Sequence, residues 1–171
     1  VRSRLMGIPT LISTATASDA ASVDITSGID STYDEYMFVF TDIAPATNAQ
    51  DFTFQVNATD DAGGDYDTSL ITSSTFQAYQ SEAGAEALEY TAASDQAQAA
   101  GFQIISRSIG SGADESCAGI LHLFSPASTT YVKHFYARMN GYYQTGSMTL
   151  TLFTAGYIND TTAIDDIQFK M

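Results

Sequence analysis

Four aspartates lie close together in one short stretch, and they are the residues of this chain best suited to hold a metal ion. In the segment 57–67, "NATDDAGGDYD", two glycines separate two pairs of acids, and these acids are Asp60, Asp61, Asp65 and Asp67. Calcium binds six to eight oxygen ligands, which a flexible acidic loop can supply, but the EF-hand spacing is absent. Calcium is therefore one hypothesis. A solvated hairpin tip, in which Asp and Gly serve turn geometry, is the simpler alternative.

The chain has one cysteine and two histidines, which is a poor supply of catalytic groups. Cys117 begins the apolar stretch "CAGILHLF" and is predicted to be a small core residue, since no local base would lower its pKa. His122 alternates with Ile120 and Phe124, so it is predicted to point into the core. The G-x-S-x-G pattern of a nucleophile elbow does not occur. We therefore predict that the protein is not an enzyme.

One segment combines basic and aromatic side chains, which is the composition of a binding surface. It is "YVKHFYARMNGYY", and its candidate contact residues are Tyr131, Lys133, His134, Arg138, Tyr142 and Tyr143. Aromatic rings beside polar groups can stack on sugar faces or anchor a protein partner. Alternatively, the segment is a pair of strands whose tyrosines lie at the boundary of the core. The two bases could also meet the acidic surface of a second copy.

The first ten residues, "VRSRLMGIPT", are expected to form an arm that precedes a single domain at 11–171. The arm combines two bases with apolar side chains, and these residues are Arg2, Arg4, Leu5, Met6 and Ile8. Such an arm could clamp an acidic neighbour or add a strand to it, and a disordered terminus is the alternative. Because the chain starts with Val and stops inside the alternation "IQFKM", both ends are expected to be cut or processed.

The charge of the chain argues against two classes of partner. Asp and Glu number 20 and Lys and Arg number 6, which gives a net charge of −14. Phosphate recognition needs clustered Lys and Arg, so we do not expect nucleic acid as a partner. An anionic membrane surface would repel the chain, and no apolar run approaches the roughly 20 residues of a membrane-spanning helix. The same charge favours cations as ligands.

The elements that must position these groups are β-strands, because apolar and polar residues alternate through most of the chain. Ten segments are predicted as strands: 10–16, 21–26, 34–43, 51–58, 68–80, 102–110, 115–126, 129–140, 146–158 and 163–171. In 34–43 both alternating sets are apolar, which predicts a central strand covered on both faces. The Ala-rich stretch 81–101 is predicted as a short helix or a long surface excursion. The sequence thus predicts an all-β fold, an antiparallel β-sandwich or jelly roll with about nine or ten strands and at most one short helix.

Three phrases, taken in order, carry a resemblance to a known family. They are "SGIDSTYDEYMFVFTDIAPATNAQDFTFQV", "LHLFSPASTTYVKHFYARMN" and "FTAGYINDTTAIDDIQFKM". Together they resemble a family of virion proteins of marine tailed bacteriophages, over nearly the whole chain from about Leu11 to Met171. The family has no assigned active residues, so no catalytic positions are carried over. The resemblance implies a part of a phage particle that is displayed outside the capsid or on the tail.

Two roles are compatible with this resemblance and with the composition. The first is a capsid decoration or cement protein on the outer surface of the virion. It would bind the major capsid protein or another virion protein as a homo-oligomer, such as a trimer. The second is the head domain of a tail fibre or spike that binds a host glycan or receptor. A third role, a polysaccharide hydrolase, rests on fold analogy alone.

Overall fold

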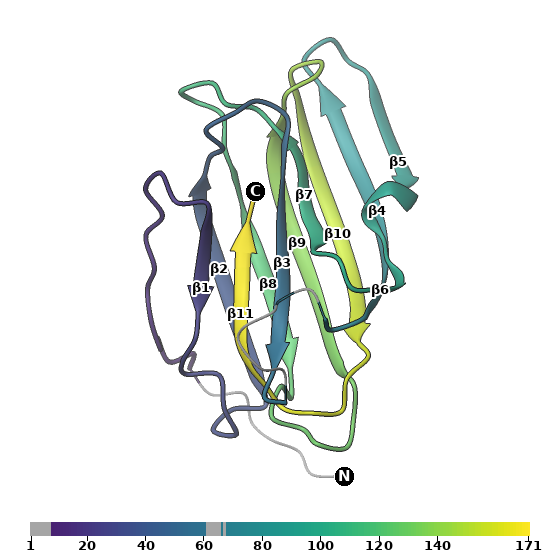
Figure 1. The fold of residues 1–171 in the computed structure, drawn as a ribbon. Helices are drawn as coiled ribbons and strands as arrows, with labels where there is room; N and C mark the ends of the chain where they lie inside the picture. Colours follow the sequence, from purple (N-terminus) through teal and green to yellow (C-terminus); the bar gives the residue numbers. More distant parts are fainter. Residues whose placement is uncertain (1–7, 61–65, 67) are drawn as a thin grey trace.

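The structure is a computed structural model that describes residues 8–60, 66 and 68–171, and these residues form antiparallel strands in two layers (Figure 1). One 3-10 helix, η1 (Ala92–Ser94), is the single helical element described, and no described helix is long and apolar enough to cross a membrane. The prediction of an all-β sandwich is confirmed, with a strand count slightly above the expected one. The eleven strands are β1 (Ser22–Ile25), β2 (Glu35–Ile43), β3 (Gln50–Ala58), β4 (Ile71–Ser81), β5 (Glu86–Tyr90), β6 (Ala97–Ala99), β7 (Gln103–Ile109), β8 (Cys117–Phe124), β9 (Lys133–Tyr143), β10 (Met148–Ile158) and β11 (Ile164–Lys170).

The chain passes repeatedly between the two layers. The front layer has the strand order β1-β11-β3-β7, and the back layer has the order β2-β8-β9-β10-β4, with β5 and β6 both paired to the outer edge of β4 (Figure 1). The layers join at one corner, where Ile109 of β7 pairs with Tyr143 of β9. Because β1 to β4 alternate between layers, the chain wraps around its own core, and the first described strand pairs with the last.

The core between the layers is richest in aromatic side chains where β2, β8 and β9 face β3 and β11. The ring centroids of Phe54 and Phe135 lie 5.1 Å apart in an edge-to-face arrangement. Phe40 of β2 and Phe169 of β11 lie 5.0 Å apart in a similar arrangement. Such pairs add about 0.5–1.5 kcal/mol beyond the burial of their area. The strand alternation that aims these rings inward also aims the intervening side chains outward, away from the other layer.

One side of β2 is less buried than the sequence predicts. Tyr36 and Phe40 are buried in the core, whereas Met37 and Val39 are 46% and 61% exposed. Among the described strands β2 pairs only with β8, so it forms the edge of the back layer. The prediction of a central strand covered on both faces is therefore wrong. Apolar residues on both sides of a strand indicate two apolar faces. They do not indicate that other parts of the same chain cover both faces.

The strand predicted at 10–16 is not formed in the structure. No strand pairing involves these residues, and β1 pairs with β11 instead. The apolar side chains of this region are uncovered: Ile8 is 94% exposed and Leu11 is 81% exposed. A strand needs a neighbour to satisfy its backbone groups. The region is thus an apolar stretch with strand composition and no strand partner within the described part of the chain.

The Ala-rich segment 81–101 forms strands at the edge of the back layer. It turns at Gly84, which has a φ of +90°, and returns along β4 as β5. After η1, β6 pairs with the lower part of β4. The helical alternative is wrong beyond the three residues of η1. The free edge of β4 offers a row of backbone partners, which outweighs the weak helical preference of the segment.

We expect Phe54→Ala to lower the free energy of unfolding by about 3–5 kcal/mol, because Phe54 is fully buried and packs edge-to-face on Phe135. Urea denaturation followed by circular dichroism measures the change. The matched control is Tyr131→Ala, which removes an aromatic ring that is 72% exposed and should cost less than about 0.5 kcal/mol. Equal losses for the two variants would contradict this placement of the core.

Candidate functional site

The outward side chains of the back layer form a broad apolar surface that the front layer does not cover. Cross-strand pairing aligns them in two central rows. One row runs from β2 to β4 through Met37, His122, Tyr136, Ala155 and Ser74. The other runs from β2 to β5 through Val39, Ile120, Arg138, Phe153, Phe76 and Tyr90. These two rows are here named the outer aromatic face.

On the β8–β9 side, the face is built around His122. The imidazole stacks on the Tyr136 ring, with centroids 4.5 Å apart and planes 14° apart, and Phe124 lies beyond it at 6.2 Å. The Nδ1 atom of His122 lies 2.6 Å from a carboxylate oxygen of Glu35. His122 is therefore buried by its outer neighbours and not by the core. Its grouping with Ile120 and Phe124 was predicted correctly, but the predicted direction into the core is wrong.

On the β10–β4 side, two phenylalanines form a second stack. Phe76 and Phe153 are 4.8 Å apart and nearly parallel, and the guanidinium of Arg138 lies 5.4 Å from the centroid of Phe153. Beside them is a hollow of about 300 Å³ that is bordered by β4, β9 and β10. Ala155, a small residue between Tyr136 and the phenylalanine stack, is part of its lining. The outer aromatic face is therefore uneven, with protruding rings around a depression.

Acidic side chains border the two central rows of this face, and one of them, Asp95, accepts a hydrogen bond from the hydroxyl of Tyr90. Neither central row contains Asp or Glu, and the nearest acid on β2, Glu35, is paired with His122. The front layer differs. There burial raises the pKa of Asp166, and the nearby charges of Asp165 and Asp24 raise it further. The front layer thus carries a cluster of three carboxylates, whereas the two central rows of the outer aromatic face carry none.

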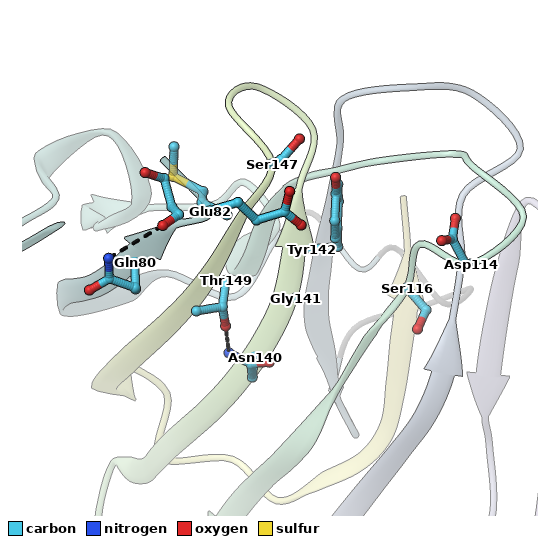
Figure 2. Close-up of a pocket in the computed structure, with 11 residues that line it drawn as sticks. Gln80, Glu82, Asp114, Ser116, Asn140, Gly141, Tyr142, Ser147 and Thr149 are labelled. Carbon is cyan, nitrogen blue, oxygen red and sulfur yellow. Dashed lines mark hydrogen bonds between the residues drawn. The ribbon is translucent and has the colours of Figure 1, made fainter. Parts of the chain in front are cut away.

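A polar hollow of about 500 Å³ adjoins the outer aromatic face at the turn that connects β9 and β10 (Figure 2). Asn140 donates a hydrogen bond to the hydroxyl of Thr149 at 2.7 Å within it. In the view of Figure 2, Tyr142 stands between the carboxylates of Glu82 and Asp114, which come from different loops. Hydroxyl, amide and carboxylate groups beside an aromatic ring can hydrogen-bond a polyhydroxylated ligand.

Strand alternation divides the predicted binding segment between opposite faces. His134 and Arg138 lie on the outer side of β9, Tyr142 lines the polar hollow, and the exposed Tyr131 precedes the strand. Tyr143, half-buried, pairs with β7 at the corner of the layers. The segment does not act as one surface. Three further residues of the outer aromatic face, Tyr136, Phe76 and Phe153, were not among the predicted contacts. The sequence signal that could have found these three residues is that each alternates along its strand with residues that point into the core.

Lys133 lies in the interior and not on the surface that the sequence suggested. It is completely buried, and its Nζ donates hydrogen bonds to the backbone carbonyls of Asp160 and Thr162. Desolvation lowers the pKa of this amine, although the nearby charges of Asp160 and Asp60 oppose the shift. Lys133 ties β9 to the connection between β10 and β11. It is thus not available to contact a second copy.

Several predicted residues lie outside the described part of the chain. These are Asp61, Asp65 and Asp67 of the acidic loop, and Arg2, Arg4, Leu5 and Met6 of the arm. Asp60 is described, and its carboxylate accepts a hydrogen bond from the hydroxyl of Thr162 at 3.0 Å. Among the described residues, no three His, Cys, Asp or Glu side chains are arranged to hold a metal ion. Calcium binding by the loop stays a prediction.

Cys117 occupies the core, as its sequence setting predicted. Its side chain is buried at the start of β8, and burial raises the pKa of the thiol to about 11. A hydrogen bond with Ser106 opposes this shift without cancelling it. At neutral pH the sulfur is therefore a protonated, enclosed packing group rather than a nucleophile.

Comparison of the chain with protein-family models, with curated proteins and with solved structures gives no match.

We expect the free energy of unfolding to fall more steeply above pH 9 in the wild-type protein than in a Cys117→Ala variant. Between pH 9 and 11 the unfolded thiol loses its proton while the folded thiol keeps it, so the free energy of unfolding falls as pH rises. The loss should approach about 2–3 kcal/mol at pH 11. Urea denaturation at pH 8, 9, 10 and 11 measures it. Parallel pH profiles for the two proteins would show that the thiol is not enclosed.

Proposed function

We propose that this chain is a structural protein of a tailed-bacteriophage particle, displayed on the outside of the capsid as a decoration or cement protein. The resemblance of its three sequence phrases to phage virion proteins supports the setting. The proposal assigns it no reaction: its thiol is buried, and His122 is held between aromatic rings and Glu35. Its partners are the major capsid protein or another virion protein, together with further copies of the chain.

The observation that carries the proposal is that the chain leaves two separate apolar surfaces without cover. One is the stretch around Ile8 and Leu11, which has strand composition and no strand partner among the described residues. The other is the outer aromatic face on the back layer. Monomeric proteins seldom expose large contiguous apolar patches, so such surfaces indicate contacts with other molecules. A cement protein needs two kinds of contact, one with the shell and one with its neighbours.

The polar hollow favours a second candidate, the head domain of a tail fibre or spike. Its lining combines Asn140, Thr149 and Tyr142 with the carboxylates of Glu82 and Asp114 (Figure 2). Sugars are bound by polar groups of this kind beside an aromatic ring. In this role the hollow would bind a host glycan, and the outer aromatic face would hold the domain in its fibre.

Quantitative mass spectrometry of purified particles tests the proposal, with the major capsid protein as the internal standard. We expect hundreds of copies of the chain per particle. Purified chain should also bind empty capsids, and a variant lacking residues 1–10 should bind at least tenfold more weakly, because it lacks the arm and Ile8. Leu11→Asp should weaken binding in the same direction. Thr161→Asp, which adds the same charge at another exposed site, should not.

Other outcomes separate the alternatives. A few dozen copies or fewer per particle, with glycan binding that Asn140→Ala and Tyr142→Phe abolish, would replace decoration by the fibre-head role. Complete absence of the chain from particles would refute both. Undiminished capsid binding after removal of residues 1–10 would exclude the arm as the attachment site.

A further inference from the structure

We propose that the outer aromatic face is a homotypic interface, through which two copies of this chain pair back layer to back layer about a two-fold axis. The inference deepens the proposed function, on which it rests for its biological setting, because it names the partner of one of the two uncovered surfaces. Its physical support comes from charge, area and shape.

Charge favours this face as the place where two copies can meet. Each copy carries a net charge of −14, so most pairs of surfaces repel one another. The two central rows contain no acid, and their one full charge is Arg138, which lies over the ring of Phe153. By contrast, Asp24, Asp165 and Asp166 lie close together on the front layer. Apposed back layers therefore place acid-free rows at the centre of the contact and keep the Asp24, Asp165 and Asp166 clusters of the two copies apart.

The area of the face is sufficient for a small specific interface. The strands from β2 to β5 across the back layer are spaced about 4.8 Å apart and span about 24 Å. The two central rows and the row on either side of them, one of which includes Glu35, extend for about 20 Å along the strands. A face of about 500 Å² per copy results, or about 1,000 Å² for a pair, which is near the lower limit for biological interfaces. Association should accordingly be weak and concentration-dependent.

The shape of the face is self-complementary. Met37 and Val39 protrude at its β2 edge, and the hollow beside Ala155 lies three strands away. A two-fold axis in the plane of contact, midway between these features, would place the protruding side chains of each copy over the hollow of the other. Such reciprocal contacts define an isologous interface. A hollow of about 300 Å³ has room for one or two such side chains.

A glycan fits the polar hollow better than it fits this face. The side chains around the hollow beside Ala155 offer few hydrogen-bonding groups, chiefly Ser74, Tyr136 and Arg138. A sugar that buried its hydroxyls there would leave most of them unpaired, at a cost for each. An apolar partner surface has no such cost, and a second copy of the same face is apolar.

Analytical ultracentrifugation of the purified chain tests the proposal. We expect the mean mass to rise from one copy toward two between about 5 µM and about 1 mM protein. Raising NaCl from about 0.05 M to about 0.5 M should strengthen the association, because salt screens the repulsion between two acidic copies. A contact held mainly by ion pairs would weaken instead, and that result would contradict the apolar interface proposed here.

Two substitutions on the face should abolish the association. Arg138→Glu places two carboxylates near the centre of the paired faces, and Val39→Asp places one at each protruding edge; both positions are exposed, so folding should survive. Lys170→Glu is the matched control, because it makes the same charge change on the front layer, where Lys170 lies over Phe102. It should associate like the wild type. Circular dichroism confirms that each variant is folded.

A wild-type chain that stays monomeric to about 1 mM would overturn the inference, as would folded Arg138→Glu and Val39→Asp variants that still associate. A trimer would also overturn it, since a three-fold ring does not pair a surface with itself.

Glycan binding that Arg138→Glu removes from a monomer would assign the face to a sugar. A monomer present in hundreds of copies per particle would refute this interface and leave the proposed function standing. A chain that dimerises but is absent from particles would refute the proposed function and leave this interface standing.

Discussion

The structure depends on one constraint: the two layers must bury a single set of aromatic side chains between them. Phe54 against Phe135, and Phe40 against Phe169, join the layers across the core. The back layer is wider than the front layer, since β4 carries β5 and β6 beyond β10. Strand alternation cannot fill one face of a sheet without also populating the other. Because the back layer carries aromatic residues on both sides, its outer side is an aromatic surface that the described part of the chain leaves uncovered.

The interior is not uniformly apolar, and its polar part is located under β7. There Thr75 of β4 and Thr154 of β10 are within hydrogen-bonding distance, and Gln103 donates to the carbonyl of Ser94. Lys133 adds hydrogen bonds to two backbone carbonyls at the lower end of the sandwich. Directional contacts of this kind specify how the layers align, whereas apolar packing alone tolerates slippage. A precisely aligned back layer keeps the rows of its outer face in register across several strands.

Much of the fold could be predicted from the sequence, because period-two alternation reports directly on strands. Nine of the ten predicted strands form, and the exception, 10–16, has the pattern but no neighbour to pair with. The candidate site was harder to predict. Alternation showed that Met37 and Val39 share a side of β2, but not that β2 is an edge. Lys133 was assigned to a surface by its charge, although three-dimensional contacts enclose it. Phe76 and Phe153 are 77 residues apart and stack only because β4 and β10 pair.

The distribution of charge explains why so acidic a chain can retain an apolar face. An uncovered aromatic surface normally promotes indiscriminate association. The acids on the front layer and in the loops disfavour approaches that bring them together, whereas the two central rows of the back layer carry none. Charge thus acts against wrong partners rather than for the right one. The single guanidinium over Phe153 keeps the face from being wholly neutral at little cost in apolar area. The role proposed above, display at high density on a particle, would require this combination, because neighbouring copies would have to meet in one arrangement and avoid others.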